Sequence, residues 1–394
     1  MKEMIRGLLE DWIRISSVNP GEQPLESSPL FGEKQYTDRI KQMAEDAGYF
    51  CQYQKVTDGR YNLFIYAGNH EKGNPLLLLQ THSDVVAGKP ELFRPKTEEG
   101  KIYGRGSCDA KGQLCAMLLG LKLARDELSR LPYGVCIALC CDEEFRHTGV
   151  DALERWERKE DVIAAFVGEP TEMKLAAACK GSIRFCIRTV GKQAHTSMTE
   201  NGVNAIYLMG KVVNIISGRL AAAIGERKDP RCGNASITVS LIKGGTVVNV
   251  VPDSCEIHVD RRLLPGEEWQ TAYEEIRECI RAGLSPEERN RTIFGEPYLR
   301  DPSYTAALPP DIERSVRSIL RKNRLCEKIG GLPFGCDASK ISPWGIPVFV
   351  FGPGSILDAH TEHEFVEISA IKKAAEMYRD VILNFGKEAS NEET

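Results

Sequence analysis

An uninterrupted apolar run is the feature that most constrains the fold of this sequence. The segment PLLLLQTHSDVV (75–86) carries four consecutive leucines before its first polar side chain, Gln80. Such a run is typical of a strand that is buried on both faces of a sheet. Other strands are predicted at 62–68, 134–141, 162–167 and 348–354, and helices at 2–16, 34–47, 111–129, 149–158, 309–323 and 367–385. This alternation predicts an α/β fold with a central, mostly parallel sheet flanked by helices.

The middle of the chain follows a different pattern. Alternating apolar and polar residues predict half-exposed strands at 182–191, 236–245 and 254–262, and amphipathic helices are predicted at 203–216 and 267–284. With a last strand near 292–298, the order β-α-β-β-α-β describes a small α+β domain. We therefore expect a catalytic domain, residues 1–180 and 298–394, interrupted by an inserted domain at 181–297. The tail KEASNEET is expected to be a disordered end.

Charge and composition argue against two classes of function. The formal net charge is −5, from 51 basic and 56 acidic residues, and no basic block stands out, so a nucleic-acid partner is not expected. No apolar run approaches the roughly 18 residues that a membrane span needs. The N-terminal segment alternates charged and apolar residues and lacks the apolar stretch of a signal peptide. The thirteen cysteines are scattered and form no CxxC pair. Together with the lack of a signal peptide, they predict a cytoplasmic protein with reduced thiols.

Acidic and imidazole side chains gather where the predicted strands end. His82 and Asp84 are two residues apart after the first run, so they point to the same face. The apolar strand in ALCCDEEF (138–145) ends in three consecutive acids, Asp142, Glu143 and Glu144, and the strand in FVGEPT (166–171) runs into Glu169. Charges at the end of a buried strand are costly unless they are paired or bind a cation. Because ligands bind at the carboxyl ends of strands in open α/β sheets, a shared cation site explains this pattern better than chance.

Two further segments carry candidate ligands. GRGSCDAKG (104–112) is not a dinucleotide fingerprint, because Asp109 stands where the third glycine is required. Asp109 precedes a predicted helix, so it is either an N-cap or a cation ligand. FGPGSILDAHTEHEF (351–365) contributes His360 and His363, whereas His147 is expected at the surface. A mixed set of histidines and carboxylates suits Zn²⁺ well, and Mn²⁺ or Co²⁺ less well.

The segments THSDVV, GRGSCDAKG, CDEEF, VGEPT and DAHTEHE, in this order and spacing, resemble the M20 family of zinc peptidases and deacylases. The resemblance covers nearly the whole chain. It implies that the inserted domain is a lid that often mediates dimerisation, so we expect a homodimer formed through this domain.

The resemblance also implies a site for two divalent metal ions, with zinc favoured and cobalt or manganese as alternatives. His82 and Glu169 would bind one ion, Glu144 and His360 the other, and Asp109 would bridge both. The family's spacing to Glu364 favours His360 over His363 as the ligand. A carboxylate that bridges two ions suits metal-assisted hydrolysis, in which both ions lower the pKa of a shared water.

The remaining roles follow from the same resemblance. Asp84 would orient His82, and Glu143 would be the general base that takes a proton from the metal-bridged water. His195, in the inserted domain, would stabilise the tetrahedral oxyanion, often in the active site of the partner subunit. The substrate and its carboxylate would be bound by Asn249, Arg262, Asp337, Gly352 and Gly354.

These inferences lead to a metal-dependent hydrolase of the amide bond of N-acyl amino acids, similar to the acetylornithine deacetylase and succinyl-diaminopimelate desuccinylase branch. A dipeptidase or carboxypeptidase of the same family is the alternative, so the expected ligand is an N-acyl amino acid or a dipeptide. A third hypothesis is a non-catalytic protein that binds acylated amino acids without metal. The presence of all five ligand positions, Asp84 and Glu143 argues against it.

Overall fold

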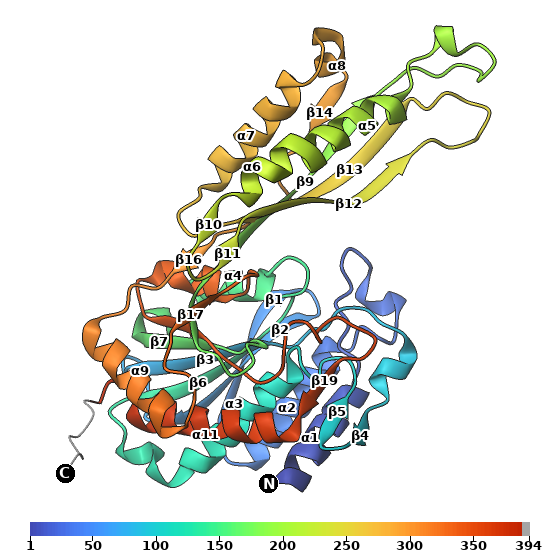
Figure 1. The fold of residues 1–394 in the computed structure, drawn as a ribbon. Helices are drawn as coiled ribbons and strands as arrows, with labels where there is room; N and C mark the ends of the chain where they lie inside the picture. Colours follow the sequence, from blue (N-terminus) through green and yellow to red (C-terminus); the bar gives the residue numbers. More distant parts are fainter. Residues whose placement is uncertain (388–394) are drawn as a thin grey trace. The chain divides into compact units, whose positions relative to one another are not determined.

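The computed structural model describes residues 1–387 and divides into two compact units (Figure 1). Unit 1 comprises Met1–Ala177, Ala306–Gly330 and, from Cys336 on, the rest of the described chain. Unit 2 comprises Ala178–Thr305 and Gly331–Gly335. Residues 388–394, which form most of the tail expected to be disordered, lie outside the described residues.

The central sheet of unit 1 has the strand order β1-β2-β6-β3-β7-β18. β3 pairs in parallel with β6 and with β7, and β7 pairs in parallel with β18. β2 is antiparallel to both β1 and β6. The strands are β1 (Phe50–Thr57), β2 (Arg60–Gly68), β3 (Leu76–His82), β6 (Gly134–Cys140), β7 (Val162–Val167) and β18 (Val348–Val350). The α/β class is as predicted, but the sheet is mixed rather than mostly parallel.

Part of the mixed character comes from a hairpin that the sequence pattern did not reveal, and the rest from β8 (Ala176–Cys179), which is antiparallel to β18. β1 lies at the edge of the sheet and alternates exposed and partly buried residues, so it lacks the apolar run of the central strands. Asp58 and Gly59 connect it to β2, and Gly59 has φ 76°. An Asp-Gly pair is favoured in two-residue hairpin loops because Gly adopts positive φ without strain. β1 and β2 therefore meet as antiparallel neighbours.

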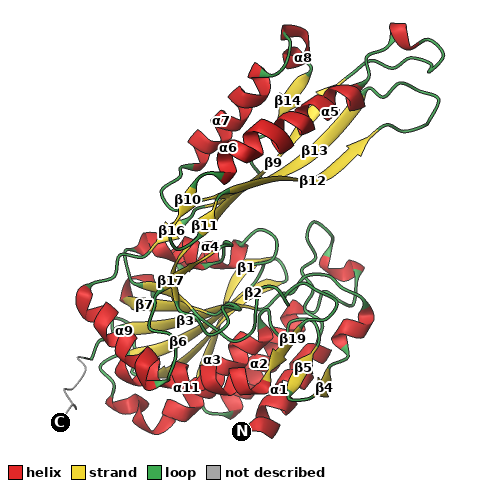
Figure 2. Cartoon of the chain, viewed as in Figure 1, coloured by secondary structure: helices red, strands yellow, loops and turns green. Residues whose placement is uncertain are grey.

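Helices cover this sheet, and the helix α3 is central to their packing (Figures 1 and 2). Nearly every residue of α3 is buried, as expected for a helix enclosed by other elements. Gly120 allows α3 to approach α11 closely, because a Cβ at this position would lie 2.7 Å from Tyr378 Cβ. The helices of unit 1 are α1 (Lys2–Arg14), α2 (Glu33–Asp46), α3 (Lys111–Ala124), α4 (Thr148–Ala152), α9 (Pro310–Lys322), α10 (Ala338–Ile341) and α11 (Ile368–Asn384).

Short strands complete unit 1 and the passage between the units. β4 (Lys96–Glu98), β5 (Lys101–Tyr103) and β19 (Phe365–Glu367) form a three-stranded antiparallel sheet. β8 (Ala176–Cys179) spans the boundary at Ala177 and pairs with β18 through Ala176. β16 (Tyr304–Thr305) and β17 (Gly330–Leu332) pair with β8.

Unit 2 is an antiparallel sheet with helices on one face (Figure 2). The strand order is β12-β13-β9-β14, and β15 also pairs with β9. α5 packs on β9 and β13, and α7 packs on β9. The elements in chain order are β9 (Gly181–Val190), α5 (Ala205–Ile215), α6 (Ala221–Gly225), β10 (Lys228–Asp229), β11 (Gly233–Asn234), β12 (Ser236–Gly244), β13 (Ser254–Leu263), α7 (Trp269–Ala282), α8 (Pro286–Asn290), β14 (Thr292–Phe294) and β15 (Leu299–Asp301). The predicted β-α-β-β-α-β succession is present within this order.

One helical stretch in unit 2 is longer than the helix predicted at 203–216. Ala205–Gly225 is helical with a kink at Gly218, and by length and composition alone it is long and apolar enough to cross a membrane. Lys211 and Arg219 interrupt its apolar residues. A single such helix is weak evidence for a membrane, since Leu208 and Val212 are buried in the core of unit 2.

Candidate functional site

Three neighbouring strands bring their carboxyl ends to one edge of the central sheet. His82 is the last residue of β3 and pairs with Cys140 of β6, two residues before Asp142. On the other side of β3, Gln80 pairs with Val167 of β7, two residues before Glu169. Because the three strands are parallel and in this register, the side chains that follow them must lie close together.

Asp109 joins two groups of ligand-type side chains at this edge. Its carboxylate Oδ1 lies 2.9 Å from His82 Nε2, and its Oδ2 lies 3.3 Å from His360 Nε2. The first group is His82, Asp109 and Glu169, and the second is Asp109, Glu144 and His360. In each group the ligand atoms lie within 4.8 Å of one another. The five residues predicted as metal ligands are therefore together, with Asp109 shared.

The alternative role of Asp109 as a helix cap is not what the structure shows. The N-cap of α3 is Ala110, and no side chain caps this helix. The Asp109 carboxylate instead faces the two imidazoles. Asp109 therefore belongs to the ligand cluster.

The charge state of the cluster fits a bound cation. Burial, with the negative charges of Asp109 and Glu143, raises the pKa of Glu169 well above its usual value. Burial also raises the pKa of Glu144. Burial opposes protonation of His360, yet its hydrogen bonds with Asp109 and Glu144 raise its pKa to about 11. The carboxylates thus need nearby positive charge, which divalent ions bound to this mixed oxygen and nitrogen set would supply.

Asp84 supports the cluster in two ways. His82 Nδ1 lies 3.0 Å from the Asp84 backbone carbonyl and 3.6 Å from its carboxylate, so the backbone oxygen makes the shorter contact. The Asp84 carboxylate accepts the backbone N–H groups of Glu143 and Glu144 at 3.1 and 3.0 Å. Burial would raise the pKa of Asp84, but His82, Arg60 and Asn19 beside it lower the pKa to about 2. Asp84 therefore contacts His82 and also accepts hydrogen bonds from the acidic segment after β6.

A buried polar network behind Asp84 was missed by sequence reasoning. Asn19 Nδ2 donates to Asp84 Oδ2 at 2.7 Å and to Asp142 Oδ1 at 2.9 Å. The Arg60 guanidinium donates to Glu33 and to Asp142, both at 2.7 Å. These residues come from distant segments of the chain, so no local pattern could have grouped them.

His147 is a correction to the sequence analysis, which placed it at the surface. Its side chain is only 12% exposed, and its Nδ1 lies 3.1 Å from Asp337 Oδ1 and 3.8 Å from Glu143 Oε1. Asp142 and His147 both have positive φ, and His147 N–H donates to the Asp142 carbonyl, so the chain turns back beneath the acidic segment. Asp337 is buried and also accepts a hydrogen bond from Gln80 Nε2 at 2.6 Å.

Glu143 lies inside this pocket of polar groups. Burial raises its pKa to about 8, although the neighbouring His147 and His82 act in the opposite direction. Glu143 is also grouped with His82 and Glu144 among side chains that could hold an ion. The geometry of Glu143 therefore fits a base beside the ligand cluster.

The two glycines predicted to bind substrate differ in their surroundings. A Cβ at Gly352 would overlap Gln113 Oε1 and would lie 2.7 Å from the Glu169 carbonyl oxygen. The Gly352 N–H donates to Thr171 Oγ1 at 3.1 Å, so this donor is already engaged. Gly354 has φ 85°, a conformation that glycine adopts without strain. Close packing around Glu169 explains why residue 352 is glycine.

The predicted residues of unit 2 fall into two separate places. His195 forms a β-bridge with Val250, and Thr196 N–H donates to the Asn249 carbonyl at 3.2 Å, so His195 and Asn249 are neighbours. Arg262 lies near the other end of β13, where it pairs with Ser182. A strand rises roughly 3.3 Å per residue, so at least about 26 Å of strand separates Arg262 from the segment that carries Asn249. Within one copy of unit 2, Arg262 and Asn249 are not brought together.

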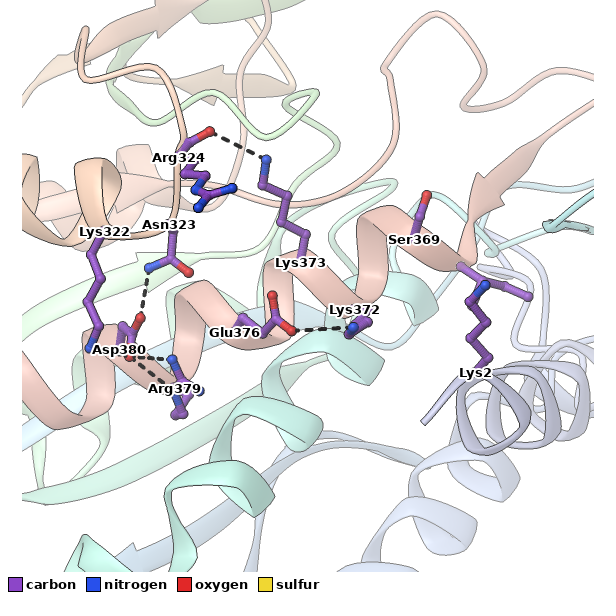
Figure 3. A pocket seen from close by; sticks show the side chains of 11 residues that line it. Lys2, Lys322, Asn323, Arg324, Ser369, Lys372, Lys373, Glu376, Arg379 and Asp380 are labelled. Atoms are coloured by element: carbon purple, nitrogen blue, oxygen red, sulfur yellow. Dashed lines mark hydrogen bonds and ion pairs between the residues drawn. The ribbon is translucent and has the colours of Figure 1, made fainter.

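A hollow of about 520 Å³ on unit 1 contains none of these residues (Figure 3). It runs along α11 and the end of α9 and is rich in lysine and arginine. Its two carboxylates are paired with neighbouring cations, Asp380 with Lys322 and Arg379, and Glu376 with Lys372. The hollow is therefore separate from the ligand cluster.

Comparison with known proteins identifies a matching family and several relatives. The chain matches Peptidase family M20/M25/M40 over residues 78–384. It is 29% identical over 360 residues to an acetylornithine deacetylase of Proteus mirabilis, a match that covers 86% of this chain and 87% of the relative. A protein of Aspergillus clavatus named a probable carboxypeptidase is 26% identical over 398 residues, covering 95% of this chain and 90% of the relative.

Solved structures share the fold at low sequence identity. A tripeptidase from Staphylococcus aureus superposes with a TM-score of 0.76 at 17% identity, covering 98% of this chain and 99% of that chain. A Bacillus subtilis protein described as a dinuclear metal binding peptidase from the M20 family has a TM-score of 0.65 at 15% identity, covering 97% of both chains. These likenesses confirm the fold.

The choice between the two histidines of the last segment can be tested by substitution. We expect His360→Gln to reduce the metal content at limiting free zinc from two ions per chain to one, because the shared carboxylate would lose its second imidazole neighbour. His363→Gln is the matched control and should retain both ions. Mass spectrometric metal analysis after dialysis measures this. Loss of metal in the His363 variant alone would reverse the assignment.

Metal binding should also release protons. At pH 7 the metal-free protein holds a proton on His360, whose pKa is raised to about 11 by Asp109 and Glu144 despite burial. A bound ion must displace this proton, so the apparent zinc affinity should rise with pH between about 6 and 8. Calorimetric titration in buffers of different ionisation enthalpy measures the release. A heat of binding that does not change with the buffer would contradict the expectation.

Proposed function

The chain belongs to the peptidase family M20/M25/M40, and from this premise we propose that it removes the acyl group from an N-acyl amino acid, as a deacylase of the acetylornithine deacetylase type. The protein is a metal-dependent amide hydrolase that acts on N-acyl amino acids or peptides. The observation that carries the proposal is the Asp109 carboxylate, which lies between His82 and His360 with Glu143 close by.

We assign five residues as ligands for two divalent ions. His82 and Glu169 would hold one ion, Glu144 and His360 the other, and Asp109 both. Zinc fits the mixed donor set best, with cobalt and manganese as alternatives. When bound, such ions polarise the substrate carbonyl and neutralise the negative charge that develops during hydrolysis.

The chain's own side chains would carry the proton. Glu143 is the proposed general base, which takes a proton from the attacking water and passes it to the leaving amine. Its supporting observation is its place beside the cluster, with its backbone held by Asp84. Asp84 keeps the His82 ring oriented through its backbone carbonyl.

Substrate selection would rest on polar groups that recognise the free carboxylate. Asn249, Arg262 and the Gly354 N–H are proposed to bind the free carboxylate, with Asn249 and Arg262 coming from different copies of the chain, since arginine offers a planar pair of donors. Both carboxylate oxygens of Asp337 are already contacted, one by Gln80 and one by His147. Asp337 would therefore line the site beside His147 without offering both oxygens to the substrate. Gly352 contributes close packing, since its N–H is engaged by Thr171.

Deacylation is favoured over peptide cleavage. Relatives named acetylornithine deacetylase cover most of the chain, and the relative named a probable carboxypeptidase keeps cleavage of peptides as the second candidate. A binding protein without catalysis is disfavoured by the complete ligand cluster with an adjacent base. Selection among these substrates depends on loop residues that vary within one fold.

We further propose a homodimer formed through unit 2, which contains the predicted inserted domain and would act as a lid. β12 is an edge strand with exposed Leu241 and Ile242, and the following loop exposes Val248. Exposed apolar groups on an edge strand favour pairing with another chain. Arg262 is distant from His195 and Asn249. This separation suits a dimer in which Arg262 contributes to the active site of one copy and the His195–Asn249 pair to that of the other. A cytoplasmic location without a nucleic-acid or membrane partner is also part of the proposal, supported by the net charge of −5 without a basic block and by the scattered cysteines.

The function can be tested with zinc-reconstituted protein and a panel of N-acetyl, N-succinyl and N-carbamoyl amino acids and dipeptides. We expect amine release from an N-acyl amino acid, with N-acetylornithine the first candidate. Glu143→Gln should keep both ions and lose nearly all turnover, whereas Glu144→Gln should lose metal. Cleavage of dipeptides alone would favour the peptidase alternative. Binding without turnover in the wild type would favour the binding protein.

His195 gives an independent test of the lid. As an oxyanion donor it should contribute about 10²–10³-fold to kcat, so His195→Ala should lower kcat by this factor. His258→Ala is the matched control, because His258 lies on β13 of the same unit and contacts Tyr298. Initial rates at saturating substrate measure the effect. An unchanged kcat in the His195 variant would assign this histidine to the surface.

A further inference from the structure

Glu364 is a buried carboxylate for which the proposed mechanism has no use. It is 1% exposed and lies four residues after His360, directly before β19. One of its oxygens, Oε1, accepts the backbone N–H groups of Gly106 at 2.9 Å, Cys108 at 3.1 Å and Asp109 at 3.2 Å. The other, Oε2, accepts from the buried guanidinium of Arg105. Every one of these partners belongs to the loop at 105–109.

This loop could not keep its shape without such an acceptor. Gly104 and Gly106 have φ values of 147° and 85°, so the chain turns sharply and its N–H groups point inward. Buried N–H groups without a partner are costly. An ionised carboxylate has only acceptor sites and can take several donors at once, whereas an amide would present an N–H₂ group to one of them. A glutamate is therefore the residue type that this convergence of donors requires.

The loop carries the carboxylate on which both halves of the ligand cluster depend. The Asp109 N–H is one of the three donors to Glu364, while the Asp109 side chain contacts His82 and His360. His360 and Glu364 are on one segment, and the Gly104 N–H also donates to the Glu364 carbonyl at 3.0 Å. Glu364 thus ties the backbone of the shared ligand to the segment that supplies a ligand to the second group.

We propose that Glu364 is a positioning residue that holds the Asp109 carboxylate where it can contact two metal ions at once. The proposal rests on the assignment of Asp109 as the shared ligand. Glu364 itself would touch neither ion nor substrate. A substitution of Glu364 should therefore change the affinity for the second ion and the magnetic coupling between the ions more than the affinity for substrate.

The test compares Glu364→Gln with Glu362→Gln in the full chain. Glu362 is two residues away and exposed, where it pairs with Lys89 at 2.6 Å, so it is a matched control. Losing a hydrogen-bonding partner behind a ligand weakens metal affinity or activity by about 10–100-fold. In Glu364→Gln we expect the second ion to bind about 10–100-fold more weakly and kcat at saturating metal to fall by a similar factor, with KM nearly unchanged. Glu362→Gln should match the wild type.

Cobalt substitution supplies a readout that a loss of stability alone would not change. Two cobalt ions that share a carboxylate are magnetically coupled, and electron paramagnetic resonance detects this coupling. The coupling should be present in the wild type and in Glu362→Gln and weakened in Glu364→Gln loaded with two ions. If Glu364→Gln does not fold, Glu364→Asp decides, because it keeps the charge but withdraws the carboxylate by one methylene.

The outcomes separate this proposal from the proposed function. If a folded Glu364 variant shows the same magnetic coupling and the same metal affinity as the wild type, the positioning role is overturned. A wild-type protein that binds two coupled ions but releases no amine from any substrate would overturn the proposed function and leave the positioning role supported. Uncoupled ions in the wild type would overturn the assignment of Asp109 and with it the positioning role.

Discussion

Buried negative charge at one edge of the central sheet is the constraint on which the rest of unit 1 depends. The parallel strands β3, β6 and β7 end side by side and deliver Glu143, Glu144 and Glu169 to one small volume. Carboxylates in such a place repel one another and lose their hydration. The raised pKa values of all three show this cost, which burial dominates. Imidazoles and, in the proposed function, two divalent ions compensate it.

A second class of carboxylates makes this arrangement possible by organising backbone rather than binding ions. Asp84 accepts the N–H groups of Glu143 and Glu144, and Glu364 accepts those of the loop that carries Asp109. Each therefore fixes the main chain of a proposed ligand or base. Hydrogen bonds from N–H groups to an ionised oxygen are stronger than those to neutral acceptors, so these anchors hold the segments firmly.

Unit 2 distributes its polar groups differently. His195 and Asn249 meet at one end of its sheet, whereas Arg262 lies near the other end, beside the residues where the chain enters the unit. The hydrophobic core between the sheet and helices α5 and α7 keeps these two ends rigidly apart. A lid built in this way suits the proposed dimer, in which each copy contributes its two ends to different places.

The sequence by itself determined the class of fold, the central strands and the candidate ligands. Apolar runs identify β3, β6 and β7, and the charged residues that end them identify His82, Glu169 and the acidic segment after β6, because both signals are local and follow from the spacing of side chains along an extended chain. The choice of Glu144 over Glu143 as a ligand rested on the family resemblance. The edge strand β1 was not predicted, because it lacks an apolar run, and its antiparallel pairing with β2 contributes to the mixed character of the sheet.

Only the tertiary structure decided which side chains support the ligands. Asn19, Arg60 and Glu364 act on residues that are 65, 82 and about 255 positions away in the chain. The His147 side chain contacts Asp337 instead of facing solvent, because positive φ at Asp142 and His147 turns the chain back. Such contacts depend on strand register and on turns that bring distant segments together. A local sequence pattern predicts neither of these.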